Sequence, residues 1–280
     1  MGTGDHLGVV SARRHMPATR RVIALLAVAV VLTTGSAAAV AVAATGGTAS
    51  PPVLAAWERA QDAGSYRFRS DLVQTVTPAS SVLNAGRASR SEQLHLAGHV
   101  DLDAGALEFD LWTAGTTRPA GDADLSIRHV DGRTLQRSGE GEWQAAADAT
   151  AVLPGGDPMG YLSSARDVAL AESVQLEGQT YDRYVFTIDG PAYAAAVAGQ
   201  VRESLRGGGA SSPGLLVDPS ASLQGMTGTG ELWVDAQGYP VRQAVALRFP
   251  EQNGEHVEAR VEVDFSAFGV DHDYGLAADP

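Results

Sequence analysis

A stretch near the end of the chain, from His256 to Phe265, alternates between polar and apolar residues without exception. Successive side chains of a β-strand point to opposite faces, so this pattern predicts a strand with one buried face and one wet face. Such a strand belongs to an antiparallel sheet that has a core on one side only. The apolar positions are Val257, Ala259, Val261, Val263 and Phe265.

The segment before this strand indicates how its neighbour pairs with it. A three-residue loop over residues 252–254 places Phe249 opposite Val257 and Leu247 opposite Ala259, so that apolar residues share one face. A two-residue turn would instead mix apolar and charged residues on each face. We therefore predict the three-residue loop, with a glycine in the left-handed position that this loop class requires.

The same argument applies one hairpin earlier. A four-residue loop over residues 236–239 places Val234 opposite Val241 and Trp233 opposite Arg242. The segment from Gly228 to Phe265 is thus predicted to form three antiparallel strands with a shared apolar face.

Further strands and three helices are predicted along the chain. Alternation with a period of two marks strands at 65–76, 93–102, 106–113, 123–130, 134–137 and 184–188. Apolar residues at helical spacing predict three helices. The first begins at Pro51 or Pro52 and ends at Gly64, the second covers residues 158–170, and the third begins at Gly190 and Pro191 and ends at Gly207. The result is a meander of short antiparallel strands whose one apolar face is covered by helices.

The N-terminal part has the features of an export signal. A stretch of 23 residues without a charge, from Val22 to Ala44, follows Arg13, Arg14, Arg20 and Arg21. A basic segment, an apolar segment and small residues for cleavage are typical of a signal peptide, although roughly 20 apolar residues also suffice to span a bilayer. The chain therefore divides into a signal peptide or N-terminal membrane anchor (1–44), a linker (45–52), a folded domain (53–268) and a tail (269–280).

Composition excludes several classes of function. The chain has no cysteine and all its basic residues are arginine, which rules out thiol catalysis, Schiff-base chemistry and the P-loop. Beyond Ala44, 16 arginines face 32 acidic residues, a charge of −16. A surface with this charge repels nucleic acid, so no nucleic-acid partner is expected.

No group of residues makes a strong case for catalysis or for metal binding. His95 and His99 are four residues apart and share a face of a strand, and with Asp101 and Asp103 they suggest at most a carboxylate and imidazole site. We interpret both histidines as solvent-facing polar positions. Carboxylate pairs such as Asp122 and Asp124 are explained by an acidic surface. We predict no enzyme activity, no metal and no cofactor.

Three segments carry a resemblance to a known superfamily: "AWERAQDAGSYRFRSDL", "VDGRTLQRSGEGEWQ" and "GTGELWVDAQGYPVRQ". In their order along the chain they resemble the LolA/LppX/LprG-type exported lipoprotein and lipid carriers. The resemblance implies an α+β fold, a strongly curved antiparallel β half-barrel with helices packed in its concave face, over residues 53–268. Actinobacterial members are usually acylated on a cysteine, so this chain would be soluble or held by its N-terminal helix.

The resemblance also implies that the apolar concave face encloses acyl chains. The alternative is that these side chains only pack against the three helices, since every one-sided sheet must bury its face. The predicted ligand-binding residues are Phe68, Phe109, Leu111, Phe186, Leu232, Val245, Leu247, Val261 and Phe265.

The function that follows is an exported carrier of lipid or lipoprotein, located in the periplasm or otherwise outside the cytoplasmic membrane, secreted or anchored by the N-terminal segment. Its expected partners are a lipid or an acylated protein and, at the N-terminal segment, the membrane. We expect a monomer. The alternative function is a membrane-tethered sensor or interaction domain with the same fold and no transport role.

Overall fold

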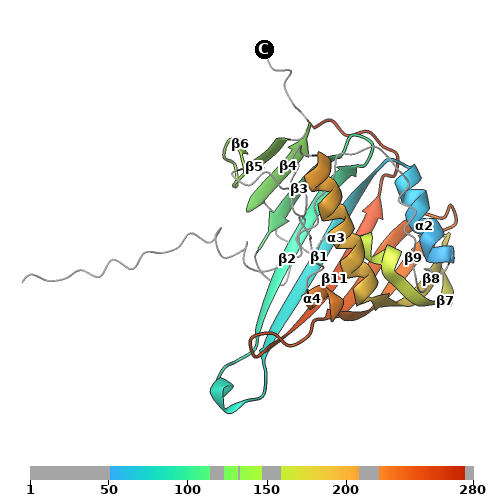
Figure 1. Ribbon diagram of the computed structural model, residues 1–280. Helices are drawn as coiled ribbons and strands as arrows, with labels where there is room; N and C mark the ends of the chain where they lie inside the picture. The colour runs from blue at the N-terminus through green and yellow to red at the C-terminus, as the bar shows by residue number, and fades with distance from the viewer. Residues whose placement is uncertain (1–50, 114–122, 132, 147–158, 208–220, 275–280) are drawn as a thin grey trace, which may run out of the picture.

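A computed structural model gives the fold, and it describes residues 51–113, 123–131, 133–146, 159–207 and 221–274. Their strands form one eleven-stranded antiparallel sheet in the order β6-β5-β4-β3-β2-β1-β11-β10-β9-β8-β7 (Figure 1). The strands are β1 (Ser65–Pro78), β2 (Arg90–Asp101), β3 (Ala106–Trp112), β4 (Leu125–Val130), β5 (Arg133–Arg137), β6 (Gln144–Ala145), β7 (Ala165–Leu176), β8 (Gln179–Asp189), β9 (Thr227–Asp235), β10 (Pro240–Arg248) and β11 (Glu255–Ser266).

The sheet consists of two meanders that meet in the middle. Strands β1 to β6 each pair with the next strand along the chain, and so do β7 to β11. The pairing of β1 with β11 joins the two meanders. The order is linear, so within the part of the chain that the structure describes the sheet is open, with β6 and β7 as its edges.

The predicted register of the last two strands, β10 and β11, is confirmed. Leu247 lies opposite Ala259 and Val245 opposite Val261, and the amide of Phe249 donates a hydrogen bond to the carbonyl of Val257. Across the junction of the meanders Val261 lies opposite Leu72. The apolar positions between His256 and Phe265 thus belong to one apolar face that continues through several strands.

The predicted three-residue loop is wrong. Asn253 and Gly254 form a two-residue turn, with φ of 52° and 71°, and Gln252 and Glu255 exchange two backbone hydrogen bonds across it. Two positive φ values in succession are typical of a type I′ hairpin turn. The register survives because residues between Phe249 and Gln252 take up the offset as an irregularity in one strand.

The hairpin between β9 and β10 is predicted in part. Trp233 lies opposite Arg242 as expected, but Pro240 takes the place opposite Val234, and the register shifts between Pro240 and Arg242. The Asp235 carboxylate accepts hydrogen bonds from the amides of residues 237 and 239, at 2.9 and 2.8 Å. This local bonding closes the turn, and the extra residue, Val241, becomes a bulge.

Two of the three predicted helices are present. They are α2 (Pro51–Asp62) and α3 (Gly190–Gly207), beside the short helix α4 (Ala221–Gln224) and the 3₁₀ turns η1 (Val82–Asn84) and η2 (Gly160–Ser164). In Figure 1, α2 and α3 both lie in front of the sheet. Their buried side chains belong to the same hydrophobic cluster as those of the strands.

The helix predicted at 158–170 is wrong. Only η2 is helical there, and Ala165 begins strand β7. Asp167 has a φ of 49°, which a continuing α-helix does not allow. A two-residue turn at Glu177 and Gly178, with φ of 53° and 81°, folds β7 back against β8 and supplies its ladder of hydrogen bonds.

Among the described residues, none of the helices has the length and apolarity needed to cross a membrane. The predicted signal peptide or anchor, residues 1–44, and most of the linker lie outside the described residues.

Candidate functional site

The structure brings the nine predicted ligand-binding residues together. All nine belong to one hydrophobic cluster, and each is exposed to 5 % or less. Six strands contribute them: Phe68 from β1, Phe109 and Leu111 from β3, Phe186 from β8, Leu232 from β9, Val245 and Leu247 from β10, and Val261 and Phe265 from β11. The predicted apolar face therefore exists, and its side chains are closely covered.

A glycine pair that the sequence analysis did not single out shapes this face. A Cβ atom added at Gly230 would lie 2.4 Å from Cζ of Phe186, and one at Gly228 would lie 2.8 Å from Cδ2 of Leu247. The Phe186 ring therefore lies directly on the backbone of β9, which only glycine permits. The signal was present in the sequence as two glycines at alternate positions of a strand, both on the face predicted to be apolar.

The helices that cover this face contribute both small and large side chains. The buried hydrophobic residues that the structure describes are Val53, Ala56 and Ala60 in α2, and Tyr193, Ala194, Val197 and Ala198 in α3. The strands below contribute mostly phenylalanine, leucine and valine. Alanine buries little apolar area, so the contacts made through the four alanines stabilise the covered state only modestly.

Aromatic stacking fixes one part of the cover. The rings of Tyr193 on α3 and Tyr161 on η2 stack with centroids 4.7 Å apart and planes 16° apart. Stacked aromatic pairs contribute about 0.5–1.5 kcal/mol beyond their buried area. This pair joins the start of α3 to the 3₁₀ turn that precedes β7.

The apolar face also holds neutral polar side chains that the sequence analysis missed. Ser70, Gln74 and Gln243 are buried at positions of β1 and β10 that alternate with outward-facing residues. The Oε1 atom of Gln74 is buried and has no hydrogen-bond partner among the described residues. The buried residues that the structure describes include no Asp, Glu or Arg. Whatever this face accepts has to be apolar or neutral in the described region.

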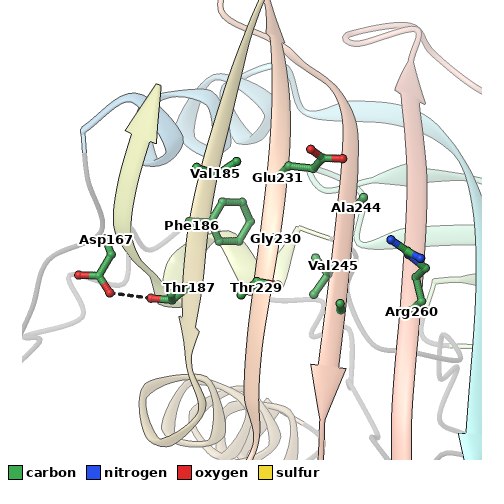
Figure 2. Close-up of a pocket in the computed structure, with 11 residues that line it drawn as sticks. Asp167, Val185, Phe186, Thr187, Thr229, Gly230, Glu231, Ala244, Val245 and Arg260 are labelled. Carbon is green, nitrogen blue, oxygen red and sulfur yellow. Dashed lines mark hydrogen bonds between the residues drawn. The ribbon is translucent and has the colours of Figure 1, made fainter. Parts of the chain in front are cut away.

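A groove of about 460 Å³ lies on the opposite face of β8 to β11 (Figure 2). Its outward-facing lining is small, with Thr187, Thr229, Ala244 and Ala246 in neighbouring strands, and the Asp167 carboxylate accepts a 2.8 Å hydrogen bond from Thr187. Two predicted residues, Phe186 and Val245, also border the groove although their side chains are buried on the other face. The groove is therefore separate from the predicted lipid-binding face.

The charges at the rim of this groove are engaged in ion pairs. Arg183 lies 2.7 Å from Glu231 and 2.7 Å from Glu172. The hydrogen bonds that Arg183 donates, first to Glu231 and then to Glu172, raise the pKa of Arg183. Exposed ion pairs of this kind hold side chains in place and contribute little to stability.

The interpretation of His95 and His99 as solvent-facing is wrong. Each is 3 % exposed. His95 Nδ1 lies 2.6 Å from Asp71 Oδ1, and His99 is covered by residues of the C-terminal tail. Among the described residues no group of three or more potential ligands could hold a metal ion. Both histidines are buried by contacts that are distant in sequence, which alternation alone could not reveal.

Comparison with known proteins gives structural neighbours only. No protein-family model and no curated protein matches the chain. Among solved structures it is similar to LprF from Mycobacterium bovis, at 10% identity over 81% of this chain and 97% of that chain, with a TM-score of 0.38. It is also similar to the lipoprotein LppX from Mycobacterium tuberculosis, at 12% identity over 80% and 99%, with a TM-score of 0.31.

A third neighbour is a DUF1329 family protein from Desulfovibrio piger, at 9% identity over 82% of this chain and 95% of that chain, with a TM-score of 0.26. Because the similarity is weak, any ligand of this chain has to be argued from its own residues.

Proposed function

We propose that this protein binds lipid, and that it holds acyl chains in the concave face of a half-barrel, between the sheet and helices α2 and α3. The observation that supports the proposal is the contrast between the two sides of the interior. Six strands present a continuous face of large apolar side chains, and four of the seven described buried hydrophobic residues with which α2 and α3 cover it are alanines. Another apolar group can replace such a cover with only a small loss of buried apolar area.

The free energy of burying methylene groups favours an acyl chain as the group that replaces the helix cover. Each buried methylene contributes about 0.8 kcal/mol, so eight of them contribute roughly 6 kcal/mol before the costs of binding. An acyl chain that takes the place of alanine side chains restores contact with the same phenylalanines and leucines. Because these are already covered, we infer that α2 or α3 shifts when lipid enters.

The polar groups on the face fit a neutral lipid segment. Gln74 has a buried oxygen without a partner among the described residues, and a buried amide is favourable only when it is hydrogen-bonded. A hydroxyl or an amide N–H of a lipid would supply the donor. The interior charges that would bind an anionic headgroup do not occur among the described buried residues.

The location follows from the N-terminal segment. We propose that residues 1–44 direct export, either as a cleaved signal or as a retained anchor, and that the acidic domain acts outside the cytoplasmic membrane as a carrier of lipid or of an acylated protein. The protein needs no catalytic group for this role.

A substitution in the helix cover tests the proposal. Ala194 on α3 is fully buried and its neighbour Ala195 is exposed. Ala194→Phe puts a ring into the space that lipid would enter. We expect it to weaken the binding of a fluorescent fatty acid such as cis-parinaric acid at least about tenfold, equivalent to about 1.4 kcal/mol.

Ala195→Phe is the matched control, and it should bind like the unmodified protein. Circular dichroism establishes that both variants are folded. Absence of saturable binding by the unmodified protein, or equal binding by folded Ala194→Phe, would contradict the proposal.

A further inference from the structure

The C-terminal residues 269–274, called here the strap, are bonded to the sheet on the face opposite the helices. The amide of Gly269 donates to the carbonyl of Ser65 at 2.9 Å, and the Ser65 hydroxyl donates to the carbonyl of Val270 at 3.0 Å. His99 on β2 contacts the strap through both ring nitrogens, Nε2 to the Val270 carbonyl at 3.2 Å and Nδ1 to the Tyr274 hydroxyl at 3.1 Å. One histidine thus joins both ends of the strap to the sheet.

The two partners of His99 define its preferred proton state. A carbonyl oxygen only accepts hydrogen bonds, so Nε2 carries the proton and donates to Val270. In the neutral ring Nδ1 is then the acceptor and the Tyr274 hydroxyl donates to it. Both contacts are satisfied by a neutral imidazole, and the ring needs no second proton to hold the strap.

The surroundings of His99 oppose a second proton. Burial and the neighbouring His272, with ring centroids 4.5 Å apart, lower the pKa of His99. Arg67, opposite His99 on β1, acts in the same direction, whereas Asp101 and the Val270 carbonyl act against it. The other charged groups around the site are Glu108 on β3, Arg128 on β4, and Asp271 and Asp273 on the strap.

The carboxylate nearest to His272 is already engaged. Glu108 accepts two hydrogen bonds of 3.0 Å from Arg128 and lies 3.6 Å from Nε2 of His272.

We propose that the strap is an acid-released clamp, docked while His99 is neutral and released when His99 takes up a proton. In the released state the ring is open to water, with a pKa near the ordinary value of about 6.5. Since the docked state has the lower pKa, docking is fully favoured above that value and weakens as pH falls below it. The ratio of docked to released strap falls about tenfold per pH unit until the docked pKa is reached.

Release would also affect helix α2. Phe268, next to the strap, stacks on Tyr239 with ring centroids 4.6 Å apart, and the guanidinium of Arg59 on α2 lies 5.0 Å from the centre of the Tyr239 ring. A Cβ atom added at Gly269, the first residue of the strap, would lie 3.5 Å from the carbonyl oxygen of Ala63. The strap therefore supports the end of α2, and its release should increase the mobility of that end.

Hydrogen exchange of the full chain, followed by mass spectrometry between pH 7.5 and pH 5 with correction for intrinsic rates, tests the clamp. We expect protection of peptides over 269–274 to fall by about tenfold per pH unit below about 6.5, while β11 and β1 stay protected. His99→Gln can keep a donor to Val270 and an acceptor for Tyr274 without titrating. In that variant the protection should not depend on pH.

His129→Gln is the matched control, because His129 is also buried, its pKa is also lowered by burial, and it bonds to Thr134 away from the strap. It should respond to pH as the unmodified chain does. Strap protection that is constant with pH in the unmodified chain overturns the clamp, as does a folded His99→Gln that keeps the response. If His99→Gln does not fold, the NMR titration of His99 in the unmodified chain decides, since a pH range different from that of strap release overturns the clamp as well.

Discussion

The two faces of this sheet are both buried around β1, β2 and β3, but by different chemistry. On the helix side Phe68, Phe109 and Leu111 are covered by apolar contacts that have no preferred direction. On the opposite side His99 is covered by hydrogen bonds to the strap, each with a defined donor and acceptor. The first kind of cover can exchange one apolar group for another, and the second responds to protons.

The largest difference in stability is expected between an aspartate placed on the inner face of β11 and one placed on its outer face. Val261 is 4 % exposed and lies between Leu72 and Val245, whereas the side chain of Arg260 is 70 % exposed. Val261→Asp buries a carboxylate without a partner and should lower the free energy of unfolding by about 4 kcal/mol or more. Arg260→Asp should change it by less than about 1 kcal/mol.

Urea denaturation followed by circular dichroism measures both changes. Equal losses of the free energy of unfolding in the two variants would contradict the assignment of Val261 to the buried face and of Arg260 to the exposed face.

A methyl group added at Gly230 sharpens the account of the inner face. The new Cβ would lie 2.4 Å from the Phe186 ring, which then has to leave its place on β9. Gly230→Ala should lower the free energy of unfolding by about 1–3 kcal/mol. Gly199→Ala on α3 is the matched control, because a Cβ there meets nothing within 4 Å, and it should stabilise by about 0.5–1 kcal/mol.

Both glycine variants are compared by thermal unfolding at the same pH. A Gly230→Ala protein as stable as Gly199→Ala would show that the Phe186 ring does not rest on β9.

The smallest effect is expected at the groove of Figure 2. Arg183→Ala removes two exposed ion pairs, to Glu172 and Glu231. The free energy of unfolding should change by no more than about 1 kcal/mol, and this difference should shrink in high salt. Denaturation at two salt concentrations measures it, and a large loss that does not depend on salt would mean that the groove is part of the core.

The face and the register of a strand are predicted most accurately, because both depend on the alternation of apolar and polar residues within the strand. Leu247 and Val261 were assigned to the correct face and register, since a slip of one residue would expose the whole set. The prediction of a three-residue loop is wrong because the actual two-residue turn at Asn253 and Gly254 is preceded by a bulge in one strand. The bulge restores the register that this turn alone would shift by one residue. The helix predicted at 158–170 is wrong because the short apolar run from Tyr161 to Val168 fits a helix and a strand equally well.

What the sequence could not supply are contacts between distant segments. His99 and Tyr274 are 175 residues apart, and nothing in the local pattern of either predicts that they meet. The buried amides Gln74 and Gln243 were also missed, since a polar residue within an apolar face breaks the alternation instead of marking a site. The candidate face and the helices α2 and α3 were thus predictable from the sequence, whereas the polar features of the face and the contacts of the C-terminal residues were not.

The most direct test is to locate a bound acyl chain. A fatty acid carrying a photoreactive diazirine is bound to the full chain and irradiated, and the labelled residues are identified by mass spectrometry. The account predicts labels on inward-facing residues such as Phe186, Leu247 and Val261, lost when unlabelled fatty acid competes. Labels confined to the groove around Thr187 and Ala246, or no label that competition removes, would contradict it.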